Sequence, residues 1–353
     1  MKVMLYGESE RFGSGAWCYA EALRDLGHEL VAFSDGERLE PARRLWARAY
    51  AKVARRPWEP YRHSHTGALR RLAAAERPEA VIILKGLFLS REDVFDLRRT
   101  GAWVVNINHD DFFSRNRNNW SPVQRRAVPA YDFIFPTREV NVAEIRPLNP
   151  NVEFFPFAYH PKLHRPVEVP AVDRERFAAD VVFVGTWEAP RARLLEALVL
   201  SVRARYAVYG EQWGNLPPGS PLKPFIRPPV WGDDLCRVVG SSKIALAFLR
   251  KENRDDYTQR TFEIPACGGV LLAERTHRHL QYYREGAEAE FFDASNADEL
   301  ASKVHKLLAD SDFRESLRAN GMLALKRQQH TYTDRLSRLV QVFHSTRKIT
   351  RYA

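Results

Sequence analysis

The chain has 353 residues, 45% of them hydrophobic, which is enough for two domains with buried cores and excludes an intrinsically disordered protein. No apolar run approaches the length of a membrane-spanning helix, and the sequence opens on a strand pattern at 2–6 without a signal peptide. Cys18, Cys236 and Cys267 lie far apart and form no CxxC pair, which argues against a zinc site or a disulfide framework. These features predict a cytoplasmic protein.

The formal net charge of +10 is concentrated near the N-terminus, where ten Lys or Arg and two Glu lie between Arg38 and Arg71. Segment 42–56 is amphipathic at helical spacing, with Trp46 and Tyr50 on its apolar side. Such a helix either contacts an anionic membrane, here the inner face, or packs its apolar side on the N-terminal sheet. We expect the packing, because one face hardly serves both contacts, while the arginines attract an anionic lipid or acceptor. No nucleic-acid partner is expected, since no binding module accompanies the charge.

Strand and helix patterns alternate along the first half of the chain, which predicts an α/β fold with a parallel, doubly wound sheet. A helix is expected at 16–26, ended by Gly27. The expected strands are 3–6, 29–33, 80–84, 103–108 and 133–136, with 153–155 as a further candidate.

The alternation restarts after a segment at 157–179 that is rich in proline and polar residues and is interpreted as the crossing between domains. Strands are expected at 180–184, 206–209, 244–248 and 270–273, and helices at 191–203, 297–309, 312–328 and 332–345. The predicted domains are 1–165 and 166–330, followed by a C-terminal helix at 331–353.

The most specific stretch of the sequence is 260–274, which predicts a short helix, a break at Gly268 and Gly269, and a buried strand. Arg260 and Glu263 are three residues apart, so they share one face of the helix. A guanidinium neutralises phosphate charge and a carboxylate accepts ribose hydroxyls. The pair therefore suits a nucleoside diphosphate.

The Arg-Thr-Phe-Glu-Ile-Pro-Ala-Cys-Gly-Gly block at 260–269 resembles the donor-binding signature of GT-B glycosyltransferases, which have two facing Rossmann-like domains. It is most similar to the spore-maturation-like (CgeB-like) group. Related family 4 enzymes carry two glutamates eight positions apart; Glu263 matches the second, and Asp255 replaces the first, with Asp256 as a competitor. The resemblance implies a nucleotide-sugar donor on the C-terminal domain and a last helix that returns to the N-terminal domain.

Gly185 and Thr186 follow the first strand of the second domain, where ligands bind in open α/β sheets. Gly185 permits close backbone approach, and the Thr186 hydroxyl suits a phosphate. By resemblance, the basic residue that holds the diphosphate is Arg191, with Arg193 as the alternative.

The resemblance also implies which residues contact the ribose, the diphosphate and the nucleobase. Glu263 would hold the ribose, and the helix amides near Thr261 would face the diphosphate. Gln212 and Trp213 follow another strand, in the region that holds the nucleobase in related enzymes; a purely structural tryptophan is the alternative.

In the first domain, His109, Asp110 and Asp111 end a buried strand. Three titratable groups are costly there unless they meet a ligand or one another. Asp110 is the first candidate for the base that takes the acceptor proton, with Asp111 and His109 behind it. A helix N-cap is the alternative, although it needs only one aspartate.

Two further segments are candidates for the acceptor side. The loop from Gly7 to Gly15 lacks the GxGxxG order of a dinucleotide site, but Gly13 and Gly15 allow a ligand close to the backbone. Lys85 ends another strand of the same sheet and is placed to hold a donor or acceptor oxygen.

The sequence thus predicts transfer of a sugar from a nucleoside diphosphate sugar, with a UDP-sugar favoured, to a saccharide or glycolipid hydroxyl. No other cofactor and no metal are expected, because arginines and helix dipoles neutralise the diphosphate in this architecture. Two alternatives stay open: a nucleotide-sugar epimerase on the same fold, and a non-catalytic protein that binds a nucleotide or sugar. The choice between retention and inversion is also open.

Overall fold

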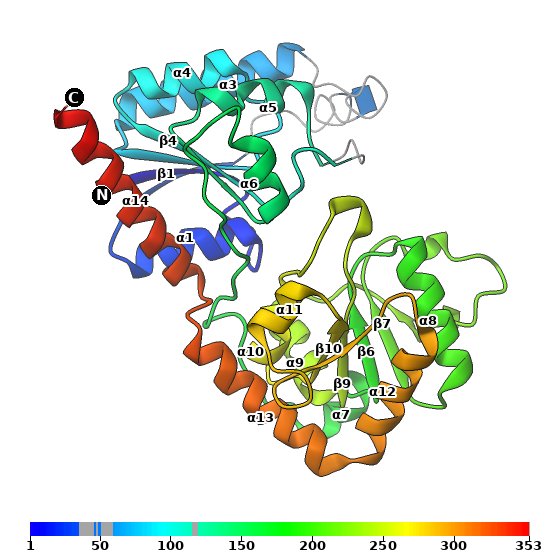
Figure 1. The fold of residues 1–353 in the computed structure, drawn as a ribbon. Helices are drawn as coiled ribbons and strands as arrows, with labels where there is room; N and C mark the ends of the chain where they lie inside the picture. The colour runs from blue at the N-terminus through cyan, green and yellow to red at the C-terminus, as the bar shows by residue number, and fades with distance from the viewer. Residues whose placement is uncertain (35–45, 47–48, 51–58, 115–118, 353) are drawn as a thin grey trace. The chain divides into compact units, whose positions relative to one another are not determined.

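The computed structural model describes residues 1–34, 46, 49–50, 59–114 and 119–352 (Figure 1). The chain forms two compact units. Unit 1 comprises Met1–Phe157, Glu252–Arg254 and Tyr332–Ala353, and unit 2 comprises Ala158–Lys251 and Asp255–Thr331. The change of unit after Phe157 precedes the boundary at 165 expected from the sequence, and the segment Glu252–Arg254 belongs to unit 1 although its neighbours in sequence belong to unit 2.

Unit 1 is built on a parallel five-stranded sheet in the order β2-β1-β3-β4-β5. β3 is apolar, β4 is apolar except at Asn106 and Asn108, and both strands are almost wholly buried, as expected for parallel strands covered on both faces. Residues 153–155 form no strand; Val152 makes only an isolated bridge with Ile134. The strands are β1 (Lys2–Tyr6), β2 (Glu29–Phe33), β3 (Ala80–Leu84), β4 (Trp103–Asn108) and β5 (Phe133–Pro136).

Helices cover both faces of this sheet, with α1 and α14 on one side and α3 and α4 on the other (Figure 1). Serine caps start three of them, at Ser14, Ser90 and Ser121, and the last two form capping boxes. The last helix packs on α1, which confirms the expected return to the N-terminal domain. The helices are α1 (Gly15–Asp25), α3 (Glu59–Glu76), α4 (Arg91–Arg99), α5 (Pro122–Ala127), α6 (Glu139–Ile145) and α14 (Tyr332–Tyr352).

The amphipathic segment 42–56 lies outside the described residues except at positions 46, 49 and 50, so its contacts stay a prediction. Trp46 is exposed. Among the helices in the described part of the chain, none is long and apolar enough to cross a bilayer.

Unit 2 contains a second parallel sheet, in the order β11-β10-β9-β6-β7-β8. β6 pairs with both β7 and β9, so the chain reverses its direction of travel across the sheet at β6. The sequence patterns missed β8 and β11, since two or three residues carry too little periodicity. The strands are β6 (Val181–Val184), β7 (Tyr206–Tyr209), β8 (Ile226–Arg227), β9 (Ile244–Ala247), β10 (Leu271–Glu274) and β11 (Glu290–Phe292).

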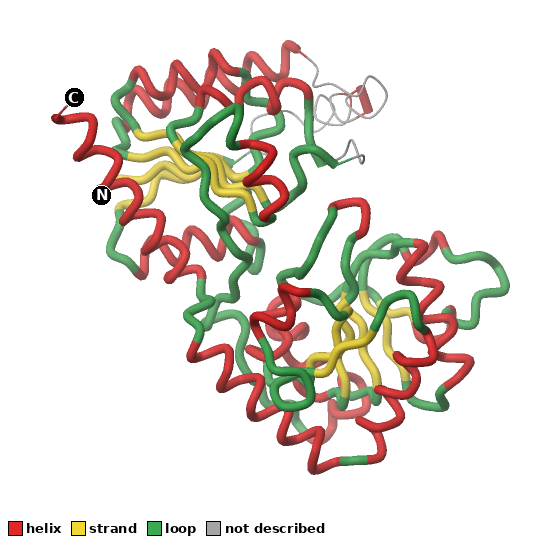
Figure 2. Tube along the Cα trace, viewed as in Figure 1, coloured by secondary structure: helices red, strands yellow, loops and turns green. Residues whose placement is uncertain are grey.

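Figure 2 shows helices around the sheet of unit 2, which is thereby buried on both faces. α8 starts two residues earlier than expected, because Pro190 fits the first turn of a helix. The two parallel α/β units confirm the fold class expected from the sequence. The helices are α7 (Arg174–Phe177), α8 (Ala189–Ser201), α9 (Gly232–Ser241), α10 (Arg260–Ala266), α11 (His277–Tyr282), α12 (Ala297–Ala309) and α13 (Ser311–Arg327).

Candidate functional site

The carboxyl edge of the unit 2 sheet has its switch point at β6, where open α/β sheets bind ligands. α10 begins beside the end of β6. The first residue of α10 contacts the last residue of this strand, because Arg260 Nε donates to the Val184 carbonyl at 3.2 Å. The Arg260 guanidinium also forms a hydrogen-bonded ion pair with the Glu263 carboxylate. The structure therefore places the Arg260–Glu263 pair, expected from the sequence, at the switch point.

His164 is a third member of this cluster, and the sequence analysis missed it. Its Nδ1 accepts the His160 amide at 3.0 Å, so the neutral ring carries its proton on Nε2, which lies 3.4 Å from Glu263 Oε1. Burial lowers the pKa of His164 and outweighs the opposite effect of Glu263. The ring is thus a neutral hydrogen donor at pH 7. The signal available in the sequence was a histidine pair in the proline-rich crossing.

Glu263 is buried, with 8% of its side chain exposed, yet its pKa is lowered. Burial by itself would raise the pKa, and the nearby Arg260 and His164 outweigh it. The carboxylate is therefore ionised at neutral pH and keeps lone pairs to accept hydroxyl hydrogens.

The amides at the start of α10 are already used. The Thr261 amide donates to the Thr258 carbonyl at 3.1 Å, and the Phe262 and Glu263 amides donate to the Gln259 carbonyl at 3.0 Å. Thr261 is fully buried, and its hydroxyl lies 2.9 Å from His279 Nε2. The amides near Thr261, which the sequence analysis expected to face a diphosphate, thus already have backbone acceptors.

Arg191 lies at the start of α8 and is buried, with 6% of the residue exposed. Its Nη1 donates to the Thr186 carbonyl at 3.1 Å and its Nη2 to the Phe248 carbonyl at 3.3 Å, so it ties the loops after β6 and β9 together. Burial lowers its pKa. The Thr186 side chain is free to face solvent, since the residue is exposed.

A cavity of about 310 Å³ opens beside Arg191. Arg193, the alternative basic residue, also lines it and is exposed at the surface. Lys251 and Glu274 close another side as an ion pair of 2.6 Å. Arg250, which the sequence analysis did not single out, pairs with Glu188 at 2.6 Å nearby. Positive side chains thus gather around the ends of β6 and β9.

Gly185 and Trp213 are close to each other. Trp213 is 3% exposed, donates from Nε1 to the Gly185 carbonyl at 2.9 Å, and packs edge-on against Phe183. Gly210 has φ 147°, and a Cβ on it would lie 2.0 Å from the Gly185 oxygen. Glycine at 210 is therefore required for the loops after β6 and β7 to touch, and Trp213 braces that contact.

Gln212 and Asp255 are the other two donor candidates. Gln212 is exposed, with φ 64°, next to the buried tryptophan. Asp255 is half-buried, and its amide donates to the Arg250 carbonyl at 3.2 Å. The competitor Asp256 lies 3.8 Å from Arg278 Nε.

In unit 1, Lys85 and Asp110 meet at the carboxyl edge of the sheet. Lys85 follows β3, Asp110 follows β4, and their charged atoms are 2.5 Å apart. Lys85 has a left-handed φ of 62°, a conformation that costs a non-glycine residue about 1–3 kcal/mol and is frequent at functional sites. Both side chains remain partly exposed to solvent.

His109 lies next to this ion pair and is held by aromatic residues. Its Nε2 is 2.9 Å from the Tyr19 hydroxyl, and its ring packs on Phe157. A Cβ on Gly15 would lie 3.7 Å from the ring, at an ordinary van der Waals distance. Burial lowers the pKa of His109 to about 4, against the effect of Asp110, so the imidazole is neutral at pH 7. Tyr19 was not a sequence candidate.

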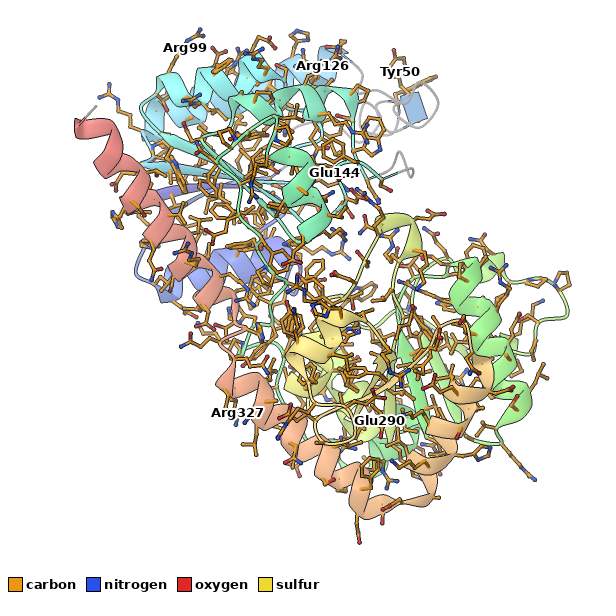
Figure 3. All side chains as sticks on the ribbon, viewed as in Figure 1. Tyr50, Arg99, Arg126, Glu144, Glu290 and Arg327 are labelled. Atoms are coloured by element: carbon orange, nitrogen blue, oxygen red, sulfur yellow. The ribbon has the colours of Figure 1, made fainter. Side chains whose placement is uncertain are left out.

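Asp111 has a different environment from Asp110. Its side chain is fully buried and accepts hydrogen bonds from Arg254 at 2.5 and 2.7 Å and from Asn141 at 2.7 Å. Arg254 also pairs with Glu144, which is labelled in Figure 3. Burial by itself would raise the pKa of Asp111, but Arg254 and Asn141 lower it. This aspartate fixes the segment Glu252–Arg254 in unit 1.

Gly13 has φ 76° in the loop after β1, where glycine is favoured, and nothing else in the described residues assigns it a role. Across the described part of the chain, no group of three or more His, Cys, Asp or Glu side chains is arranged to hold a metal ion.

Comparison with known proteins shows likeness in fold and in part of the sequence. Residues 191–341 match the model of a family described as glycosyl transferase-like. No curated protein matches the chain. A sucrose-phosphate synthase from Thermosynechococcus elongatus has a TM-score of 0.67 at 12% identity, with 100% of both chains covered.

Two other solved structures are similar over nearly the whole chain. A glycosyltransferase from Rickettsia africae has a TM-score of 0.65 at 11% identity, with 98% of each chain covered. Anabaena Alr3699/HepE in complex with UDP and glucose has a TM-score of 0.63 at 9% identity, covering 98% of this chain and 100% of the other. These likenesses establish the GT-B fold.

Proposed function

We propose that the protein is a glycosyltransferase that moves a sugar from a nucleoside diphosphate sugar to a hydroxyl of a saccharide or glycolipid acceptor. The observation that carries the proposal is the ionised, buried Glu263 paired with Arg260 at the switch point of the unit 2 sheet. This pair lies within the stretch that matches the glycosyl transferase-like family model.

On the donor side, Glu263 accepts the ribose hydroxyls, because its carboxylate is ionised and held in place by Arg260 and His164. The guanidinium of Arg260, with Arg191 and Arg250 beside the same strand ends, stabilises the charge of the leaving diphosphate without a metal. UDP is the favoured nucleotide, and the similarity in fold to HepE, which was solved with UDP and glucose, supports this choice.

On the acceptor side, Asp110 removes the proton of the attacking hydroxyl, and Lys85 holds the base in position across their 2.5 Å ion pair. The neutral His109 accepts or donates a hydrogen bond to the acceptor. Asp111 is left out of the catalytic set, because Arg254 and Asn141 already occupy its carboxylate.

The test is a thermal-shift screen with UDP, GDP, TDP, ADP and CMP on the wild type and on Glu263→Gln. A ligand at a hundred times its Kd stabilises a protein by about 2.7 kcal/mol, which is a visible shift. We expect one nucleoside diphosphate, UDP first, to stabilise the wild type and to lose this effect in Glu263→Gln.

Glu211→Gln is the matched control, since Glu211 is exposed at the end of β7 on the same edge of the sheet. It should respond to the nucleotide like the wild type. Absence of a shift with every nucleotide would sink the donor-site assignment. Binding of UDP without release of UDP from a panel of UDP-sugars would favour a non-catalytic protein.

A further inference from the structure

Two of the three cysteines meet inside unit 2. Cys236, in α9, and Cys267, at the C-terminal cap of α10, have Sγ atoms 3.0 Å apart. They are 0% and 1% exposed. A disulfide has an S–S distance of about 2.05 Å, so the two sulfur atoms need to approach by only about 1 Å to form one. Nothing in the proposed glycosyl transfer uses these thiols.

The backbone around the two thiols is held in place. A Cβ on Gly240 would lie 2.7 Å from the Cys267 carbonyl oxygen, so glycine lets α9 approach the end of α10 this closely. Arg318, from α13, donates to the carbonyls of Gly240, Gly268 and Ser242. One guanidinium therefore joins the end of α9 to the residue after Cys267, and the two sulfur atoms stay opposed.

The two thiols differ in their hydrogen bonds and in the direction of their pKa shifts. Cys267 donates its S–H to Cys236, whose own S–H points to the Leu163 carbonyl at 3.1 Å. The hydrogen bond from Cys267 lowers the pKa of Cys236 against the effect of burial, while the pKa of Cys267 is raised. Cys236 therefore forms the thiolate first, and the thiolate is the reactive form of cysteine.

We propose that Cys236 and Cys267 are a redox-modification site, a dithiol that a peroxide converts to an intramolecular disulfide. The Cys236 thiolate attacks one oxygen of hydrogen peroxide, breaking the O–O bond, and becomes a sulfenic acid as hydroxide leaves. The Cys267 thiol then attacks the Cys236 sulfur, forming the S–S bond and releasing water. Two electrons pass from the two thiols to the peroxide, and a thiol reductant reverses the change.

The location gives this modification a consequence for the donor side. Cys267 ends the helix that carries Arg260 and Glu263, and the Leu163 carbonyl precedes His164. Disulfide formation removes the S–H donor from Leu163 and links α9 covalently to α10.

The experiment treats the whole protein with hydrogen peroxide, alkylates it after unfolding, and digests it without reductant. We expect alkylatable thiols to fall from three to one, with a peptide pair joined through Cys236 and Cys267, and full recovery after a thiol reductant. Three alkylatable thiols after treatment, or sulfinic acids without a joined peptide pair, would overturn the proposal.

Cys18 provides the matched control, because it is also buried but lies in unit 1. In Cys18→Ser, peroxide should still convert Cys236 and Cys267 together to the disulfide. Cys267→Ser should form no cross-link, and its Cys236 should be trapped as a sulfenic acid by dimedone. A cross-link between Cys18 and Cys236 in Cys267→Ser would contradict the site.

Discussion

His164 Nε2 lies 3.4 Å from Glu263 Oε1, and the orientation of this contact is set by a backbone amide on the far side of the imidazole ring. Because the His160 amide occupies Nδ1, the proton of the neutral ring points at the carboxylate. A histidine of the proline-rich segment thereby fixes the direction of the glutamate on which the proposed donor site depends.

His164→Leu should weaken UDP binding about tenfold, which corresponds to about 1.4 kcal/mol, because Glu263 loses a donor that orients it. Isothermal titration calorimetry measures the affinity. His277→Leu is the control, since His277 lies on the exposed side of α11. Equal UDP affinities in His164→Leu and the wild type would show that the contact does not position the carboxylate.

Acidification should destabilise unit 2 through His279, which is fully buried. Its Nδ1 donates to the Glu274 carbonyl at 2.6 Å, so its Nε2 accepts the Thr261 hydroxyl. Burial lowers the pKa of His279 to about 4. The unfolded chain therefore binds the proton first as the pH falls below about 6.5, and stability is lost progressively down to pH 4, by about 3 kcal/mol in total.

Urea unfolding at pH 7 and pH 4.5 checks this expectation. His279→Gln should be less stable than the wild type at pH 7 but should lose less stability between the two pH values. His305→Gln, at an exposed position of α12, should keep the wild-type pH dependence. An unchanged pH dependence in His279→Gln would contradict the assignment.

Substitution of Asp110 should affect kcat, whereas substitution of its neighbour Asp111 should affect the free energy of unfolding. Asp110→Asn should lower kcat by about 10²–10⁴-fold with little effect on UDP affinity, because it removes the proposed base. Asp111→Asn should lower the free energy of unfolding by about 1.5–3 kcal/mol, because the buried side chain loses its charge-assisted hydrogen bonds from Arg254. Steady-state kinetics and urea unfolding on both variants make the comparison. A larger loss of kcat in Asp111→Asn than in Asp110→Asn, at equal folded fraction, would reverse the roles.

Gly210→Ala should destabilise unit 2 by about 3 kcal/mol or more, since its Cβ would lie 2.0 Å from a backbone oxygen and its φ is unfavourable for alanine. Gly214→Ala in the same loop should change stability by less than about 0.5 kcal/mol, because no atom lies within 4 Å of its Cβ position. Thermal unfolding of both variants measures the difference. Similar midpoints would mean that the loops after β6 and β7 do not need their close contact.

The sequence by itself determined the alternation of strands and helices, because buried parallel strands are continuous apolar runs and their helices carry caps and glycine stops. Strands β2 to β5 and β7 begin and end where these patterns predict. The Arg260–Glu263 pair was also predictable, since two residues three apart on one helix share a face whatever surrounds the helix. The sequence pattern did not predict strands as short as β8.

Only the tertiary structure decided which of the polar residues at the strand ends share an environment. Asp110 and Asp111 are adjacent in sequence, yet one is paired with Lys85 at the surface and the other is enclosed by Arg254, 143 residues away. His164 approaches Glu263 across 99 positions, and Cys236 meets Cys267 across 31. Burial, charge pairing and pKa are set by such distant neighbours, and periodicity in a sequence reports only on local structure.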